Sequence, residues 1–226
     1  MAPIPELRVS QTTPFAHTGL DYFGPMYIKY SGETRKRWVC LFTCLVTRAI
    51  HLEVIQDMTA VEFLYAFRRF IATSGTPCVI ISDNASQFKC SNSVLKSVWK
   101  TVITDTDVLN YVANTGITWK FITELAPWMG GFYERLVGLV KKSFRKMLGR
   151  KLVTDIQLQT LLKEVDAIVN SRPLVYVGYD LESNITLTPR HFLTLNPNIG
   201  VPNLDYDMHD PDYEPVESST SKLLRI

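Results

Sequence analysis

Three acidic residues in separate parts of the sequence, Asp21, Asp83 and Glu134, have side chains whose combination points to chemistry. Asp21 lies in an apolar segment between Leu20 and Tyr22, where an ionised carboxylate is costly unless a cation or hydrogen-bond donors compensate it. Three carboxylates that converge repel one another unless a divalent metal is bound, and oxygen ligands select Mg²⁺ or Mn²⁺. Two such ions about 4 Å apart promote in-line phosphoryl transfer. The three acids therefore suggest a two-metal site.

Each acid also has an ordinary structural explanation. Asp21 would open a turn at Gly24-Pro25, because Asp is common at turns. Asp83 would form an Asx turn or cap a helix. Glu134 would lie on the solvated face of a surface helix. For each acid taken singly, the structural explanation is at least as good, and only the combination of the three favours catalysis.

The hydrophobic periodicity around the acids predicts an α/β protein with a mixed sheet. The predicted order is three strands, a helix, a strand, a helix, a strand and two helices. Thr59 and Glu62 form a capping box at the start of the first helix. The expected segments are three strands within 17–55, with breaks at 31–33 and near 48, a helix from 60 to about 74, a strand at 78–81, a helix at about 94–112, a strand at 117–122, and helices at about 132–148 and 154–170.

The predicted elements place the second and third acids at typical site positions. Asp83 directly follows the apolar run 78–81, and the carboxyl ends of buried strands are where α/β sheets gather their ligand sites. Glu134 lies near the start of a helix and shares a polar stripe with Gly138, Lys141 and Arg145. Gly138 leaves room for a bulky ligand. The apolar side of this helix consists of Phe132, Leu136, Val140, Phe144 and Met147.

Charge is distributed unevenly, although the formal net charge is only +2. A basic block follows Glu134, and we expect it to hold phosphate groups of a nucleic acid. An acidic cluster near the end of the chain would repel them. The basic block consists of Arg135, Lys141, Lys142, Arg145, Lys146, Arg150 and Lys151, and the acidic cluster of Asp205, Asp207, Asp210, Asp212, Glu214 and Glu217.

The four cysteines, Cys40, Cys44, Cys78 and Cys90, lack zinc-site spacing, so we expect free, buried thiols of an intracellular protein. The sequence shows no signal peptide, and its most apolar run, 39–46, is too short to span a membrane. We therefore expect no membrane association. Residues 1–14 are predicted to be an extended lead-in, 15–195 the folded core, and 196–226 an acidic, proline-containing tail that is poorly ordered.

Several segments in a fixed order resemble the catalytic core of retroelement integrases, most closely those of BEL/Pao-type LTR retrotransposons. The resemblance runs from about Pro3 to Pro202. Each segment is a modest signal, but their order makes the resemblance strong. The segments are PFAHTGLDYFGP, WVCLFTCLVTRAIHLEVI, IISDNASQF, APWMGGFYERLVGLVKKSFRKML, IVNSRPLVY and LTPRHFL.

This resemblance implies an RNase H-like fold, here a mixed five-stranded sheet flanked by helices, and the D,D,E triad of polynucleotidyl transferases. In that family pattern, Asp21 would bridge two Mg²⁺ (or Mn²⁺) ions, while Asp83 and Glu134 would each hold one. The implied function is a DNA strand transferase that processes 3′ ends and joins retroelement DNA to target DNA. The resemblance further implies a homo-oligomer that acts in the nucleus.

The resemblance also assigns DNA-binding residues near the acids. Lys141 stands where related integrases place a lysine that contacts the element's DNA end, and Lys142 and Arg145 continue the basic stripe. Asn84 and Gln87 match polar positions beside the active site.

Two departures from the family pattern leave other functions open. The interval between Asp83 and Glu134 is longer than in retroviral integrases and requires an extended helix or loop. We also expect the chain to lack the zinc-binding domain that the family carries upstream, and its acidic tail to leave no clear room for the C-terminal DNA-binding barrel. The alternatives are a non-catalytic core that binds DNA or protein, and an RNase H-like nuclease that only hydrolyses.

Overall fold

The computed structural model describes residues 7, 9–82, 101–102, 104–121, 131–149, 152–177 and 185–196, with the backbone alone for 131–134, 176–177 and 185. Its main sheet has five strands in the order β3-β2-β1-β4-β5. The first three strands pair antiparallel, whereas β4 is parallel to β1 and β5 is parallel to β4. The predicted mixed five-stranded sheet is therefore confirmed. The strands are β1 (His17–Tyr30), β2 (Glu33–Cys44), β3 (Ile50–Ile55), β4 (Val79–Ser82) and β5 (Thr118–Phe121).

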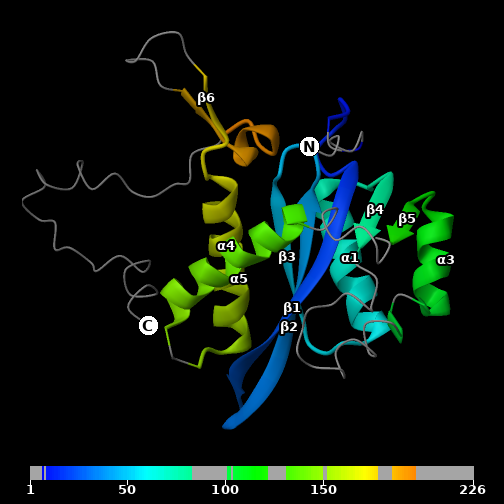
Figure 1. Ribbon diagram of the computed structural model, residues 1–226. Coiled ribbons are helices and arrows are strands. Elements are labelled where there is room, and N and C mark those ends of the chain that lie inside the picture. The colour runs from blue at the N-terminus through cyan, green and yellow to red at the C-terminus, as the bar shows by residue number, and fades with distance from the viewer. Residues whose placement is uncertain are drawn as a thin grey trace, which may run out of the picture.

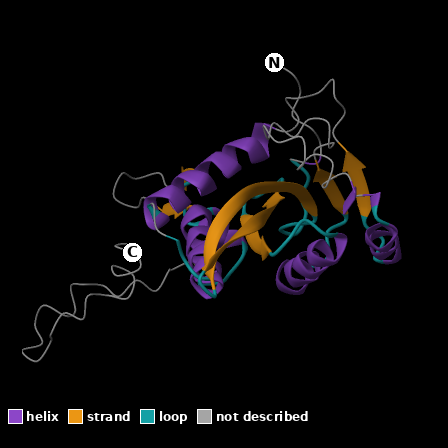
Figure 2. Ribbon diagram, turned by 90° about the horizontal axis from the view of Figure 1, so that it is seen from below, coloured by secondary structure: helices purple, strands orange, loops and turns teal. Residues whose placement is uncertain are grey.

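Helices cover both faces of this sheet (Figures 1 and 2). Helices α1 and α3 pack on one face, over a core that includes Tyr22 and Phe42. Helices α4 and α5 pack on the other face, over a core that includes Phe23 and Leu41. The helices are α1 (Ala60–Ser74), α3 (Thr106–Asn114), α4 (Gly131–Leu148) and α5 (Asp155–Asn170).

Helix α1 begins and ends where the sequence predicts, but only half of the predicted capping box forms, because the Glu62 carboxylate accepts from the N–H of Gln56 and not from that of Thr59. The side chain of Thr59 accepts a hydrogen bond from the backbone N–H of Glu62, which satisfies one free donor of the first turn. Phe63, Phe67 and Phe70 recur at helical spacing and are completely buried against the sheet. Gly75 ends the helix with φ 86°, a left-handed conformation that favours glycine.

The start of α5 is fixed by a capping box and an ion pair. The side chain of Thr154 accepts from the N–H of Gln157, while Gln157 bonds back to the N–H of Thr154. Asp155 is held by the buried Arg37 of β2 through two hydrogen bonds of 2.7 and 2.8 Å. This bidentate contact fixes the orientation of α5 on the sheet.

Several local predictions were wrong. The predicted helix at 94–112 is interrupted in its described part, because Asp105 is extended and caps α3 with its side chain. No turn forms at Gly24-Pro25, since β1 continues with a register shift between Phe23 and Met26. A small sheet of β6 (Val175–Val177) and β7 (Ile185–Leu187), and a 3-10 helix η3 (Pro189–Phe192), were not predicted.

The cysteine prediction holds in part. Cys40 and Cys44 are buried free thiols, as expected, whereas Cys78 is free but exposed because it precedes β4. Cys90 lies outside the described residues. Over the described ranges, no helix is long and apolar enough to cross a membrane.

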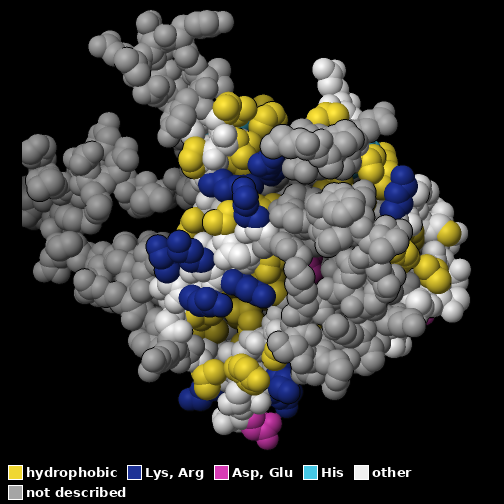
Figure 3. Space-filling model, viewed as in Figure 1, with side chains coloured by type: hydrophobic (Ala, Val, Ile, Leu, Met, Phe, Trp, Pro, Cys, Tyr) yellow, Lys and Arg dark blue, Asp and Glu magenta, His cyan; other side chains and the backbone are white. Residues whose placement is uncertain are grey.

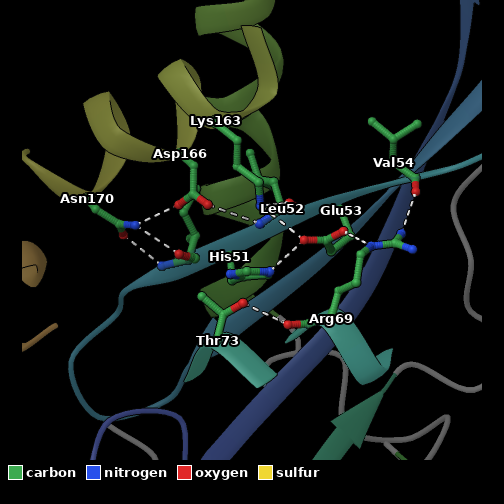
Figure 4. Close-up of polar contacts among 10 residues, drawn as sticks. His51, Leu52, Glu53, Val54, Arg69, Thr73, Lys163, Asp166 and Asn170 are labelled. Carbon is green, nitrogen blue, oxygen red and sulfur yellow. Dashed lines mark hydrogen bonds and ion pairs between the residues drawn. The ribbon is translucent and has the colours of Figure 1, made fainter. Parts of the chain in front are cut away.

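The outer edge of β3 is closed by side chains (Figure 4). Asn170 pairs with both the N–H and the C=O of Ile50, at 2.8 Å each. Asp166 accepts a hydrogen bond from the N–H of Leu52, and Lys163 donates one to the C=O of Leu52. The C=O of Val54 accepts from Arg69. Helices α5 and α1 therefore satisfy backbone groups that an edge strand otherwise leaves open to pairing with another chain.

Candidate catalytic site

The first two acids follow residues that lie side by side in the sheet. Leu20 of β1 pairs with Ser82 of β4, and the two strands are parallel. Asp21 follows Leu20 in the sequence, and Asp83 follows Ser82. Asp83 itself lies outside the described residues, as do Asn84 and Gln87.

Asp21 lies on the face of the sheet that α4 covers. Side chains alternate along a strand, so Asp21 shares its face with Phe23 and not with Leu20 or Tyr22. Phe23 belongs to the core under α4, whereas Leu20 and Tyr22 belong to the core under α1. Asp21 is half-buried, and its Oδ1 lies 2.7 Å from the backbone N of Tyr22.

Helix α4 presents an apolar side to the sheet and a basic side to solvent. Leu136, Val140, Phe144 and Met147 are buried, which confirms the apolar side predicted for these residues. Lys141, Lys142 and Arg145 are exposed. Figure 3 shows Lys and Arg side chains gathered over the region of α4. Glu134 lies in the first turn of this helix by its backbone, and its side chain is outside the description.

The basic side of α4 is open beside Glu134. Gly138 is exposed, and a methyl group added there would meet no atom of the described residues within 4 Å. Glycine is unfavourable in a helix interior, and here packing against the sheet does not require it. The position therefore leaves space on the stripe that carries Lys141.

One aromatic ring connects α4 with the strand of Asp21. The Nζ of Lys141 lies 5.7 Å from the ring centre of Phe23. The ring of Phe144 packs on Phe23 as well, with centroids 6.4 Å apart. Sequence reasoning missed Phe23, although its place two residues after Asp21 puts it on the same face of the strand.

Two weak acids, Tyr22 and Cys40, are buried together on the face of the sheet opposite to that of Asp21. Burial raises the pKa of Tyr22, and the neighbouring Cys40 raises it further. Burial likewise raises the pKa of Cys40, and the charges of Glu53 and Asp21 add to this effect. Both groups stay protonated at neutral pH, so neither adds negative charge beside Asp21.

No group of three or more His, Cys, Asp or Glu residues is arranged to hold a metal ion in the part of the chain that the structure describes. Of the three predicted metal ligands, only the side chain of Asp21 falls within this part. The two-metal site and its ligands therefore remain a prediction.

No family model matches this sequence, and no curated protein is similar to it. Solved structures do share its fold. The HTLV-2 integrase catalytic core domain in complex with magnesium aligns in its dimeric form with a TM-score of 0.51 and 17% identity, covering 77% of this chain and 94% of that one. Its trimeric form aligns with a TM-score of 0.52 and 15% identity, covering 80% and 98%.

A larger assembly contains a similar chain. The simian T-cell lymphotropic virus intasome in complex with PP2A regulatory subunit B56 gamma aligns with a TM-score of 0.57 and 15% identity over 95% of this chain. The present chain spans 64% of the length of that one. Two of these three structural neighbours are integrase catalytic core domains. The likeness shows that this chain has their α/β fold, as predicted.

Proposed function

We propose that this protein is the catalytic core of a metal-dependent DNA strand transferase. The observation that carries the proposal is the pairing of Leu20 with Ser82 in neighbouring parallel strands, because the next residues are Asp21 and Asp83. Helix α4, whose first turn contains Glu134, packs on the face of β1 to which Asp21 belongs. Ligand sites of α/β sheets gather at such strand ends.

The donor set fits Mg²⁺ or Mn²⁺. Carboxylate oxygens are the ligands these ions prefer, and Asp21 is half-buried on the face of α4. In the proposed site, the carboxylates of Asp21, Asp83 and Glu134 would together hold the two ions. When bound, such a pair of ions activates a hydroxyl nucleophile and stabilises the leaving oxygen.

The remaining residues of the proposed site bind DNA. Lys141, Lys142 and Arg145 hold backbone phosphates, because they are exposed on the solvent side of α4. Asn84 and Gln87 contact the DNA beside the acids. Water first cleaves a phosphodiester near the 3′ end of the element. The freed 3′ hydroxyl then attacks a phosphorus of target DNA, forming one phosphodiester bond and breaking another.

We further propose that the chain derives from a BEL/Pao-type retrotransposon, with residues 15–195 as the core and 196–226 as an acidic tail. Homo-oligomerisation is part of the proposal, and the similar HTLV-2 core occurs in dimeric and trimeric forms. The site of action is the nucleus, where target DNA is found.

The test uses the purified full chain with Mn²⁺ and two labelled substrates, a blunt duplex of element-end sequence and a branched mimic of the joined product. We expect end cleavage, joining and resolution of the branched DNA. Asp21→Asn, Asp83→Asn and Glu134→Gln should each lose nearly all activity, because each removes a metal ligand. Asp107→Asn, at an exposed acid of α3, is the matched control and should stay active.

The products distinguish this function from its alternatives. Cleavage without any joined product indicates a nuclease. DNA affinity that falls steeply with salt, with no chemistry and no carboxylate-dependent Mn²⁺ binding, indicates a binding module. The proposal is wrong if the wild-type protein is inactive, or if Asp83→Asn is as active as the wild type.

A further inference from the structure

A groove runs along the closed edge of β3, away from the proposed catalytic site. It encloses about 700 Å³ between the C-terminal end of α1 and the side of α5, and η3 forms part of its wall. Strand β2 separates β3 from β1, so the groove is distinct from the surroundings of Asp21. The polar residues along this edge are shown in Figure 4.

Two acidic groups, Asp166 in the wall of the groove and Glu53 of β3, already have hydrogen-bond partners. Glu53 is bound by His51 at 2.9 Å, by Arg69 at 2.6 Å and by Lys163 at 3.0 Å. Burial alone would raise the pKa of Glu53, but these three partners outweigh it and lower the pKa to about 2. Asp166 accepts from Leu52 and Asn170, as the closed edge requires. The charge of Glu53 is therefore compensated, whereas the two hydrogen-bond donors of Asp166 are neutral groups.

The cations at the groove, in contrast, have unused donors. Within the described ranges, the Arg190 side chain forms no hydrogen bond or ion pair, and its Nε is buried. Lys163 directs two of its three N–H groups to Leu52 and Glu53, which leaves one. Buried polar atoms almost always have a partner, and an unsatisfied one calls for an explanation, such as a functional role or a bound water or ion.

The backbone of β3 restricts what can bind in the groove. The outward N–H and C=O groups of Ile50 are both bonded to Asn170, and those of Leu52 to Asp166 and Lys163. A peptide therefore cannot add as a further strand without displacing these side chains. Recognition in the groove has to use its side chains.

We propose that this groove binds a small organic oxyanion, a carboxylate or a phosphate ester. Arg190 and Lys163 bind the charged oxygens, because a guanidinium and an ammonium with free donors form strong, charge-assisted hydrogen bonds. Phe192 and Leu193 also line the groove, and as exposed apolar side chains they contact the organic part. The enclosed volume is that of an ordinary small-molecule site. This inference does not depend on the strand-transferase function.

The experiment titrates the ¹⁵N-labelled full chain with benzoate, phenyl phosphate and benzamide, without metal or DNA. Benzamide has the same ring as benzoate but no charge. We expect benzoate or phenyl phosphate, and not benzamide, to shift the amide signals of Gly75 and Ala167, which line the groove. The stronger of the two anions identifies the oxyanion class.

Variants test the two cations. Arg190→Gln should weaken binding of the anion at least about tenfold, since it removes a charged hydrogen-bonding partner. Lys163→Gln should weaken it as well, with urea unfolding recorded because Lys163 also supports β3. Arg68→Gln, at an exposed arginine of α1 outside the groove, is the matched control. Equal binding by Arg190→Gln and wild type, or equal shifts with benzamide, overturns the proposal. If inorganic phosphate binds as tightly as phenyl phosphate, the groove does not recognise the organic portion of the ligand, and that part of the proposal is wrong.

Discussion

The ammonium group of Lys141 lies 5.7 Å from the centre of the Phe23 ring. A cation at this distance is attracted to an aromatic face by about 0.5–1 kcal/mol at an exposed site. Phe23 is buried and fixed by Phe144, so the ring is a rigid support. Since Phe23 and Asp21 share one face of β1, the ring sets the position of the lysine relative to the first acid.

Phe23→Leu should therefore lower the affinity for DNA by about two- to fivefold, which corresponds to the cation–π energy. Lys141→Ala should lower it more, and Phe23→Leu should add nothing in the Lys141→Ala background. Fluorescence anisotropy with a labelled duplex measures all four proteins. Phe67→Leu, a buried ring on the other face, controls for lost packing and should leave the affinity unchanged. Additive effects of the two changes would contradict this coupling.

Replacing Gly138 tests stability and DNA binding separately, because an alanine should change only the first and a tryptophan the second. Gly138→Ala should raise the free energy of unfolding by about 1 kcal/mol, because alanine is the better helix former and meets no atom there. Gly138→Trp should fold but weaken DNA binding by about tenfold or more, which equals about 1.4 kcal/mol. Urea unfolding and anisotropy measure the two effects. Ala72→Trp, at an exposed position of α1, should leave DNA binding unchanged. Unaltered binding by Gly138→Trp would show that DNA does not approach this stripe.

Local signals were sufficient where a short segment determines its own structure. Thr59 and Glu62 located the start of α1, and the apolar period of α4 identified its buried side. The break at Asp105 was missed because the apolar residues on both sides of it keep a helical period, while a single side chain caps a new helix. The structural alternative for Asp21, a turn at Gly24-Pro25, does not occur because pairing with β2 carries the strand through.

Sequence spacing also produced hypotheses about the candidate site, of which the structure describes the surroundings of Asp21 and the basic side of α4. The place of Asp83 after an apolar run, and the shared stripe of Gly138 and Lys141, could be derived from sequence spacing. The role of Phe23 as a support for Lys141 could not, because it depends on where α4 crosses β1. The closed edge of β3 was equally inaccessible, since Ile50 and Asn170 are far apart in the sequence and meet only in the folded protein.

The side chain of Asn170 makes the two backbone hydrogen bonds with Ile50 that a neighbouring strand would otherwise make, so removing it should lower the free energy of unfolding. Asn170→Ala leaves both backbone groups of Ile50 without a partner, and we expect a loss of about 2–3 kcal/mol in the free energy of unfolding. Urea denaturation followed by circular dichroism measures it. Asn110→Ala, at an exposed position of α3, should change stability by less than about 0.5 kcal/mol. A similarly small effect at Asn170 would show that water replaces its hydrogen bonds.

The low pKa of Glu53 makes a directional prediction for acid pH. Its folded-state pKa of about 2 lies below the ordinary value of 4.5, so the ionised form is stabilised by folding. This stability is present above about pH 4.5 and is lost as the pH falls towards 2. Glu53→Gln should therefore be less stable than wild type at pH 7, and the difference should shrink over that range. Urea midpoints at several pH values measure it, with Glu33→Gln, an exposed acid of β2, as control. If the stability difference between wild type and Glu53→Gln does not change with pH, the lowered pKa of Glu53 is contradicted.

The parallel pairing of β1 with β4 also constrains when the protein can become active during its synthesis. Thr18 pairs with Ile80, and two strands and a helix lie between them in the chain. Contacts between such distant segments form slowly, because the intervening chain has to be ordered first. A growing polypeptide that ends before β4 contains Asp21 but not the strand that precedes Asp83. Any chemistry that needs both acids, including the strand transfer proposed above, therefore requires a chain that extends past β4, and nascent chains and N-terminal fragments that end earlier should lack it.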